Sequence, residues 1–184
     1  SQITFICEKD RSHFAESILK ELKNNFNIKR NLTDFNIEYL YHALSSKLIW
    51  VEWANNPAIL ISKLKRNKQK VFVRLHRYEM YRKKYLERMK WKNIDTVIFV
   101  NKDLEKEFNK IVPSATTCTI PNSVEINQFP LTKRNEENTL LAYGYEFNPI
   151  KGYINLIKLF NKLLKKDSSF KLTIAGKYPE NNIY

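Results

Sequence analysis

The sequence contains very little glycine. Only three of its 184 residues are glycines, namely Gly144, Gly152 and Gly176, and none precedes Gly144. A Walker-type phosphate loop and the Gly-x-Gly-x-x-Gly turn of dinucleotide-binding folds both need glycine where the backbone approaches phosphate. Neither motif can occur before Gly144, which argues against a P-loop NTPase and against an ordinary dinucleotide-binding first domain.

Cysteines and long apolar runs are also scarce. Two isolated cysteines, Cys7 and Cys118, are too few for a disulfide framework, and no metal-ligand spacing is present. No apolar run approaches the roughly 18 residues that span a membrane. The first ten residues, SQITFICEKD, lack the pattern of a secretory signal peptide. We therefore expect a cytoplasmic protein without a bound metal or cofactor.

Acidic residues are outnumbered by basic ones. The sequence has 32 Lys and Arg against 19 Asp and Glu, a net charge of +13, and residues 63–92 carry thirteen of the basic residues but only two acids. Such a balance indicates a polyanion, a phosphate-bearing ligand or an anionic membrane surface as partner. The alternative is a solvated surface.

The end of this basic segment, Met80–Lys92, predicts one amphipathic helix. Tyr81, Tyr85 and Met89 would share one side, and the basic residues Arg82, Lys83 and Arg88 would be exposed. A basic helix with aromatic residues is typical of contact with anionic lipid. Because no nucleic-acid-binding signature is present, nucleic acid is the less favoured partner.

Eight short apolar runs of the strand type recur along the sequence. They are Ile3–Cys7, Phe26–Leu32, Leu48–Trp53, Val71–His76, Thr96–Val100, Thr117–Ile120, Thr139–Tyr143 and Phe170–Ile174. Apolar residues at helical spacing lie between several of them, in Phe14–Leu22, Ala58–Leu64, Leu104–Val112 and Tyr153–Leu164. This alternation predicts an α/β fold with a Rossmann-like, doubly wound parallel sheet.

The composition changes near residue 131. Residues 1–130 carry the first six strand patterns, and residues 131–138, LTKRNEEN, are polar and are interpreted as a linker. Residues 139–184 contain one strand–helix–strand unit, which is too small to bury both faces of its own sheet. We expect them to be the start of a second α/β domain that continues past Tyr184.

Polar and aromatic side chains follow the predicted strands. Ligands of doubly wound sheets bind beyond the carboxyl ends of the strands, and this rule nominates Glu8, Asp10, Glu52, Trp53, His76, Glu79 and Asn101. His76 can hydrogen-bond a phosphate or a sugar hydroxyl. The alternative is a loop histidine satisfied by the backbone. His13 and His42 lie in helical segments, where surface or packing roles are expected.

A second cluster lies in Tyr143–Gly152, at the turn before the last helix. Lys151 and Gly152 stand at or near the start of that helix. A lysine beside the free N–H groups of a helix start is well placed to bind phosphate. The alternative is an ordinary turn with a surface lysine.

Two segments resemble a known family. IPNSVEINQF at Ile120–Phe129 is similar to the interdomain segment of the group 1 (family 4) glycosyltransferases. Leu140–Glu180, with a strand, a lysine–glycine turn, a long helix and a second strand, resembles the opening of that family's donor-binding domain. The two segments occur in the family's order and spacing, and the βα rhythm of the preceding residues is compatible with it.

The resemblance implies a GT-B fold, with two Rossmann-like domains and a cleft between them. It implies transfer of a sugar from a nucleotide-diphosphate sugar, which is a substrate, to a glycan or lipid-linked acceptor. Retention of configuration and independence of metal are also implied. By this analogy His76 contacts the donor sugar or its phosphate, Glu79 orients His76 or an acceptor hydroxyl, and Lys151 with Gly152 binds the diphosphate. Asn122 becomes a possible cleft residue.

The expected cellular role also follows from the family. Its members build surface polysaccharides or glycolipids, which would place the basic residues 63–92 at the inner face of the membrane. Two positions depart from the family pattern: Glu146, a further possible cleft residue, stands where an arginine is common, and Ser123 replaces a glycine. The family's paired donor-binding glutamates would fall past Tyr184, so these residues alone are expected to be inactive. The alternative is a non-catalytic module that binds glycan, protein or nucleic acid.

Overall fold

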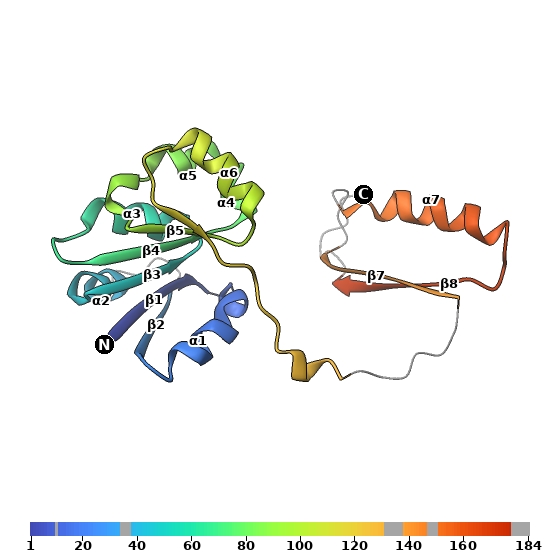
Figure 1. Ribbon diagram of the computed structural model, residues 1–184, viewed down its shortest axis with the longest axis horizontal. Helices are drawn as coiled ribbons and strands as arrows, with labels where there is room; N and C mark the ends of the chain where they lie inside the picture. The colour runs from blue at the N-terminus through green and yellow to red at the C-terminus, as the bar shows by residue number, and fades with distance from the viewer. Residues whose placement is uncertain (10, 34–37, 131–137, 147–150, 178–184) are drawn as a thin grey trace. The chain divides into compact units, whose positions relative to one another are not determined.

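A computed structural model of the protein describes residues 1–9, 11–33, 38–130, 138–146 and 151–177 (Figure 1). The chain forms two compact units, Ser1–Phe129 and Pro130–Tyr184. The predicted linker at residues 131–138 lies outside the described residues except for Asn138. None of the helices in the described ranges is long and apolar enough to cross a membrane.

A six-stranded parallel sheet forms the centre of the first unit. Its strands are β1 (Gln2–Glu8), β2 (Asn27–Thr33), β3 (Leu48–Glu52), β4 (Lys70–Leu75), β5 (Thr96–Phe99) and β6 (Thr117–Thr119). They are arranged in the order β2-β1-β3-β4-β5-β6, and each neighbouring pair is parallel. The predicted α/β, Rossmann-like sheet is confirmed for this unit.

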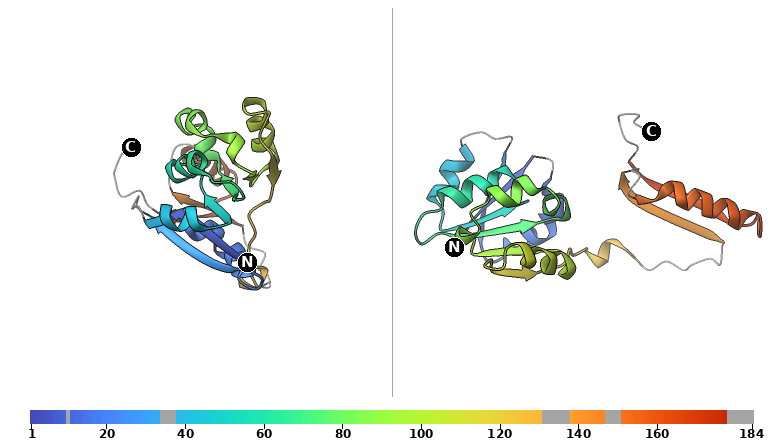
Figure 2. Two further views of the ribbon diagram at one scale, coloured as in Figure 1. Left: turned by 90° about the vertical axis from the view of Figure 1, so that its left-hand side faces the viewer. Right: turned by 90° about the horizontal axis from the view of Figure 1, so that it is seen from above.

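Helices cover the two faces of the sheet unequally (Figures 1 and 2). The helical segments are η1 (Ser12–Ala15), α1 (Glu16–Leu22), α2 (Glu38–Ser45), α3 (Asn56–Leu64), α4 (Arg77–Met80), α5 (Lys83–Arg88), η2 (Trp91–Asn93), α6 (Lys102–Ile111) and η3 (Ile126–Gln128). Residues of α2 to α6 build the larger core cluster, and η1 and α1 contribute to the smaller one on the other face. The polar ends of the central strands therefore emerge between two covered faces.

The predicted helix over Met80–Lys92 is wrong. The segment contains α4, α5 and η2 as separate short pieces, and Met89 has extended backbone angles. Met80, Leu86 and Met89 are all buried in the larger core. On one continuous helix, Met80 and Leu86 would point about 120° apart, so a break is needed to bury both. Residues 80–92 therefore do not form a single amphipathic helix, although Arg82, Lys83 and Arg88 are exposed as expected.

The second unit consists of one strand–helix–strand motif within its described residues. Strands β7 (Thr139–Glu146) and β8 (Lys171–Lys177) are parallel, and α7 (Tyr153–Leu164) connects them. Gly152 caps α7 with a φ of 73°, a left-handed conformation that glycine adopts without strain. Apolar side chains remain exposed on both layers, including Leu141, Tyr143 and Leu159.

Candidate functional site

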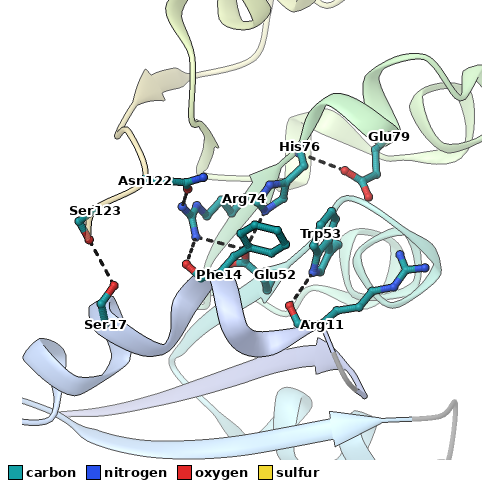
Figure 3. A network of polar contacts seen from close by, with 10 residues as sticks. All are labelled: Arg11, Phe14, Ser17, Glu52, Trp53, Arg74, His76, Glu79, Asn122 and Ser123. Atoms are coloured by element: carbon teal, nitrogen blue, oxygen red, sulfur yellow. Dashed lines mark hydrogen bonds and ion pairs between the residues drawn. The ribbon is translucent and has the colours of Figure 1, made fainter. Parts of the chain in front are cut away.

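The candidate site lies at the carboxyl ends of β3 and β4 (Figure 3). Glu52 is the last residue of β3 and is paired in register with Arg74 of β4. His76 follows β4 by one residue and starts α4. Because the strands are parallel and adjacent, their ends meet at one edge, which brings these three side chains together. We call them, with Trp53, Glu79 and Asn122, the carboxyl-edge network.

A buried carboxylate holds the network together. Glu52 is completely buried, and its Oε1 accepts a hydrogen bond from Arg74 at 3.2 Å. The same oxygen lies 2.7 Å from Nε2 of His76. Arg74 is itself only 1% exposed. A charged pair removed from water in this way is maintained only when the charges compensate each other and make further hydrogen bonds.

Arg74 makes those further bonds to two distant segments. Its Nη1 donates to the carbonyl oxygen of Phe14 at 3.1 Å, and its Nη2 donates to Oδ1 of Asn122. The segment around Asn122 is also held to α1, where Ser17 Oγ lies 3.2 Å from Ser123 Oγ. The network thus connects the sheet to η1 and to the segment that follows β6.

Trp53 forms an aromatic wall of the site. Its ring is stacked on His76 with centroids 4.0 Å apart and an interplanar angle of 25°, and its Nε1 donates to the carbonyl oxygen of Arg11 at 3.2 Å. The φ angle of Trp53 is 75°. Left-handed backbone is costly for a bulky side chain and persists where surrounding contacts enforce it, often at functional sites. The enforced turn places the indole against the histidine.

Glu79 is a buried acid beside the histidine. Its Oε2 accepts a hydrogen bond from the backbone N–H of His76 at 3.0 Å. Burial raises the pKa of Glu79 from 4.5 to about 7, even though this hydrogen bond acts in the opposite direction. A substantial fraction of Glu79 therefore carries a proton near neutral pH, as carboxyl groups that donate protons or hydrogen bonds often do.

Three polar atoms of the network lack a hydrogen-bond partner in the described part of the chain. They are Oε2 of Glu52, Nε of Arg74 and Oε1 of Glu79. Buried polar atoms are almost always paired, so unpaired ones in one cluster need an explanation. Two of the three are carboxyl oxygens of side chains that are completely buried, Glu52 and Glu79.

An apolar cavity of about 350 Å³ lies on the face of the sheet next to Arg74. Its wall is formed by α1, by alternate residues of the strands and by the segment after β6: Ile3, Ile18, Leu22, Leu48, Trp50, Phe72, Arg74, Ile98, Ile120, Pro121 and Ser123. Apolar pockets with a few polar groups at one end are typical small-molecule sites.

Cys7 lies in the smaller core near this edge. Burial, followed by the negative charges of Glu52 and Glu8, raises the pKa of the Cys7 thiol to about 12. The thiol is therefore protonated and is not a nucleophile at neutral pH. Among the residues that the structure describes, no three His, Cys, Asp or Glu side chains gather closely enough to hold a metal ion.

The structure brings together five of the residues that the sequence nominates: Glu52, Trp53, His76, Glu79 and Asn122. Glu8 is the last residue of β1, and its carboxylate lies 3.3 Å from Nε of Arg11. Asp10 and the side chain of Glu146 lie outside the described residues. Lys151 and Gly152 stand at the start of α7 in the second unit.

Asn101 has a structural role that the sequence analysis did not assign. Its Oδ1 accepts hydrogen bonds from the N–H groups of Asp103 and Leu104, so it is the N-cap of α6. An asparagine at this position satisfies two N–H groups that the helix itself leaves free. The structure therefore explains Asn101 without a ligand.

Sequence reasoning missed Arg74, Phe14 and Arg11. A signal for Arg74 exists, because it interrupts the apolar run Val71–Leu75 of a central strand. An arginine in such a run is buried, and a buried charge needs a partner. Phe14 and Arg11 carry no comparable signal, since their contacts with the network depend on the path of the chain after β1.

Comparisons with known proteins do not assign the site to a family. No protein-family model matches the sequence, and no curated protein is significantly similar to it.

Proposed function

We propose that the protein is a glycosyltransferase that moves a sugar from a nucleotide-diphosphate sugar to a glycan or lipid-linked acceptor. The observation that carries this proposal is the carboxyl-edge network, in which a buried carboxylate fixes a histidine against a tryptophan. The network lies where open α/β sheets bind their ligands. A small number of placed polar groups suits the hydroxyl groups of a sugar.

The carboxyl-edge network includes a residue from one of the two segments that carry the family resemblance. Asn122 belongs to the segment Ile120–Phe129 that resembles the interdomain segment of group 1 glycosyltransferases, and it accepts a hydrogen bond from Arg74. A two-domain GT-B architecture remains part of the proposal. In it, the described strand–helix–strand motif of the second unit is the start of the donor-binding domain.

The charges of the candidate residues suggest separate roles for the sugar and the diphosphate of the donor. Arg74 is neutralised by Glu52, so the network offers hydrogen bonds to sugar hydroxyls rather than a positive charge to a diphosphate. The diphosphate is assigned to Lys151 at the start of α7, a 12-residue helix. Helix N–H groups and a lysine together stabilise the negative charge that develops on the leaving diphosphate.

Within the network, we assign His76 to direct contact with the donor sugar. Glu52 and Glu79 are positioning residues, because Glu52 binds the ring and Glu79 binds the backbone N–H of His76. The cavity beside Arg74 is available to an apolar part of an acceptor. Surface polysaccharide or glycolipid synthesis is the corresponding cellular process.

Replacing His76 with alanine is expected to reduce turnover at least about tenfold, because the sugar loses a contact and Trp53 loses its stacking partner. The protein, expressed to its natural stop codon, is incubated with UDP-, GDP-, ADP- and CMP-sugars, and released nucleotide is measured by mass spectrometry. His42→Ala is the matched control, since His42 lies on α2 outside the network. Circular dichroism establishes that both variants are folded.

The outcomes separate the transferase from its alternative. Release from one of the UDP-, GDP- or ADP-sugars, reduced in His76→Ala and unchanged in His42→Ala, supports the proposal and identifies the donor class. Release from CMP-sugars alone contradicts the diphosphate donor, because these sugars carry a single phosphate. Release that His76→Ala leaves unchanged contradicts the assignment of His76. If no donor is turned over with acceptors present, the non-catalytic binding module becomes the better account.

A further inference from the structure

Arginines and tyrosines alternate beside the carboxyl-edge network. The guanidinium of Arg82 lies 4.2 Å from the ring centroid of Tyr78, and that of Arg77 lies 5.7 Å from the centroid of Tyr81. Arg11 lies 5.8 Å from the ring of Tyr78 and 5.6 Å from that of Trp53. We call Arg11, Arg77, Tyr78, Tyr81 and Arg82 the arginine–tyrosine row. It is continuous with the network, because Arg11 reaches across Trp53 (Figure 3).

Two guanidiniums of the row are not neutralised. Arg11 is paired with Glu8 at 3.3 Å. In contrast, no carboxylate in the described ranges lies within ion-pair distance of Arg77 or Arg82, and both side chains are exposed. The one neighbouring acid on α5, Glu87, is paired with Lys83 at 3.3 Å. A second acid, Glu107, accepts a hydrogen bond from the hydroxyl of Tyr81 at 3.2 Å. Three arginines against Glu8 and Glu107 leave the row with a net positive charge beside the network.

The stacking orients this charge for anions that present two oxygens. A guanidinium held against an aromatic face loses rotamer freedom but keeps its N–H edge for hydrogen bonding. That edge matches the two oxygens of a carboxylate, or two oxygens of a phosphate, in a bidentate arrangement. Arg77 is the first residue of α4, and Arg82, five residues later, is the N-cap of α5. Two anionic groups of one ligand can therefore be bound together.

The same geometry disfavours the two macromolecular partners suggested by the charge. Nucleic-acid bases need open aromatic faces for stacking, whereas guanidiniums lie over the rings of Tyr78 and Tyr81. Membrane insertion needs exposed apolar side chains, whereas Met80, Leu86 and Met89 of this segment are buried in the core. The chemistry left at the surface is a set of oriented N–H donors.

We propose that the arginine–tyrosine row binds the anionic groups of an acidic glycan, so that the acceptor carries carboxylate or phosphate substituents. This inference rests on the proposed function, because only a transferase has an acceptor. The row would hold the charged residues of the glycan while its reacting end reaches the carboxyl-edge network. Surface polysaccharides with uronate or phosphate groups have the required chemistry.

The test measures binding of a fluorescently labelled tetragalacturonate to the protein by anisotropy at about 0.15 M salt, where distant charges are screened. The double variant Arg77→Gln/Arg82→Gln is expected to bind at least about tenfold more weakly, because two charge-assisted contacts are lost. Lys23→Gln/Lys29→Gln removes the same charge at the β2 side of the sheet and is expected to bind within twofold of the unchanged protein. Labelled maltotetraose, which is neutral, serves as the uncharged ligand.

Equal loss of affinity in both double variants, or equal affinity for maltotetraose, would overturn the inference. So would tighter binding of oligothymidylate or of phosphatidylglycerol vesicles than of tetragalacturonate. Donor turnover without tetragalacturonate binding would overturn this inference and leave the transferase proposal intact. Tetragalacturonate binding could also depend on Arg77 and Arg82 while no donor is turned over. That result would support glycan binding by the arginine–tyrosine row and overturn the proposed function.

Discussion

Replacing Glu52 with leucine will lower the free energy of unfolding by about 3–5 kcal/mol, the range observed when one partner of a buried ion pair is removed. The reason is that Arg74 would remain in a site where it is 1% exposed, without the carboxylate that compensates its charge. Urea unfolding followed by circular dichroism measures the change.

A double variant distinguishes the stability lost with the ion pair from the cost of leaving Arg74 buried and unpaired. Glu52→Leu/Arg74→Leu removes both charges and is expected to be more stable than Glu52→Leu alone, because no buried charge is left unpaired. Glu125→Gln is the surface control. It breaks the exposed pair with Lys20 at 3.0 Å and is expected to cost less than about 1 kcal/mol. A cost for Glu52→Leu as small as that of Glu125→Gln would contradict the description of the network.

The stability of the protein will fall as pH rises from about 4.5 to about 7 through the contribution of Glu79. Its folded pKa is about 7 against an ordinary value of 4.5. Between these values the folded state keeps a proton that the unfolded state has released, so the contribution of Glu79 is fully present at lower pH and is lost as pH rises. The change amounts to about 3 kcal/mol, since each pKa unit corresponds to about 1.4 kcal/mol.

The measurement compares the protein with its Glu79→Gln variant across pH 4.5 to 8. Glutamine keeps an oxygen that can accept the hydrogen bond from the N–H of His76 but does not titrate. As pH rises, the unchanged protein is therefore expected to lose about 3 kcal/mol of unfolding free energy relative to the Glu79→Gln variant. Glu87→Gln, at an exposed residue of α5, provides the flat control. A pH-independent difference for Glu79→Gln would show that Glu79 titrates as an ordinary carboxyl group.

Much of the fold follows from apolar periodicity. Each predicted strand overlaps an observed one, and the predicted stripe from Tyr153 to Leu164 coincides with α7. The pattern does not predict α2, because only Tyr39 and Ala43 of that eight-residue helix are buried in the core. The break between α4 and α5 is also missed, since it depends on burying Met80 and Leu86 against one core.

The sequence predicts those residues of the candidate site that follow from the strand topology. It does not predict those that depend on contacts between distant segments. The ends of parallel strands meet, which nominates Glu52, His76 and their neighbours. The left-handed turn at Trp53 and the contacts of Arg74 with Phe14 have no local signature, because segments far apart in the sequence produce them. The membrane interpretation of residues 63–92 depended on a helix that the structure does not contain.

Nuclear magnetic resonance of the tryptophan side chains tests most directly whether the carboxyl-edge network is the ligand site. The protein has three tryptophans. The indole N–H of Trp53 donates to the carbonyl oxygen of Arg11 at the network, whereas that of Trp91 donates to the carbonyl oxygen of Leu86 in α5. Titration with the four nucleotide-sugar classes and tetragalacturonate, with Trp→Phe variants for assignment, is predicted to shift the Trp53 signal for at least one ligand and leave that of Trp91 in place. An unchanged Trp53 signal with every ligand, or a shift confined to Trp91, would contradict the proposed site.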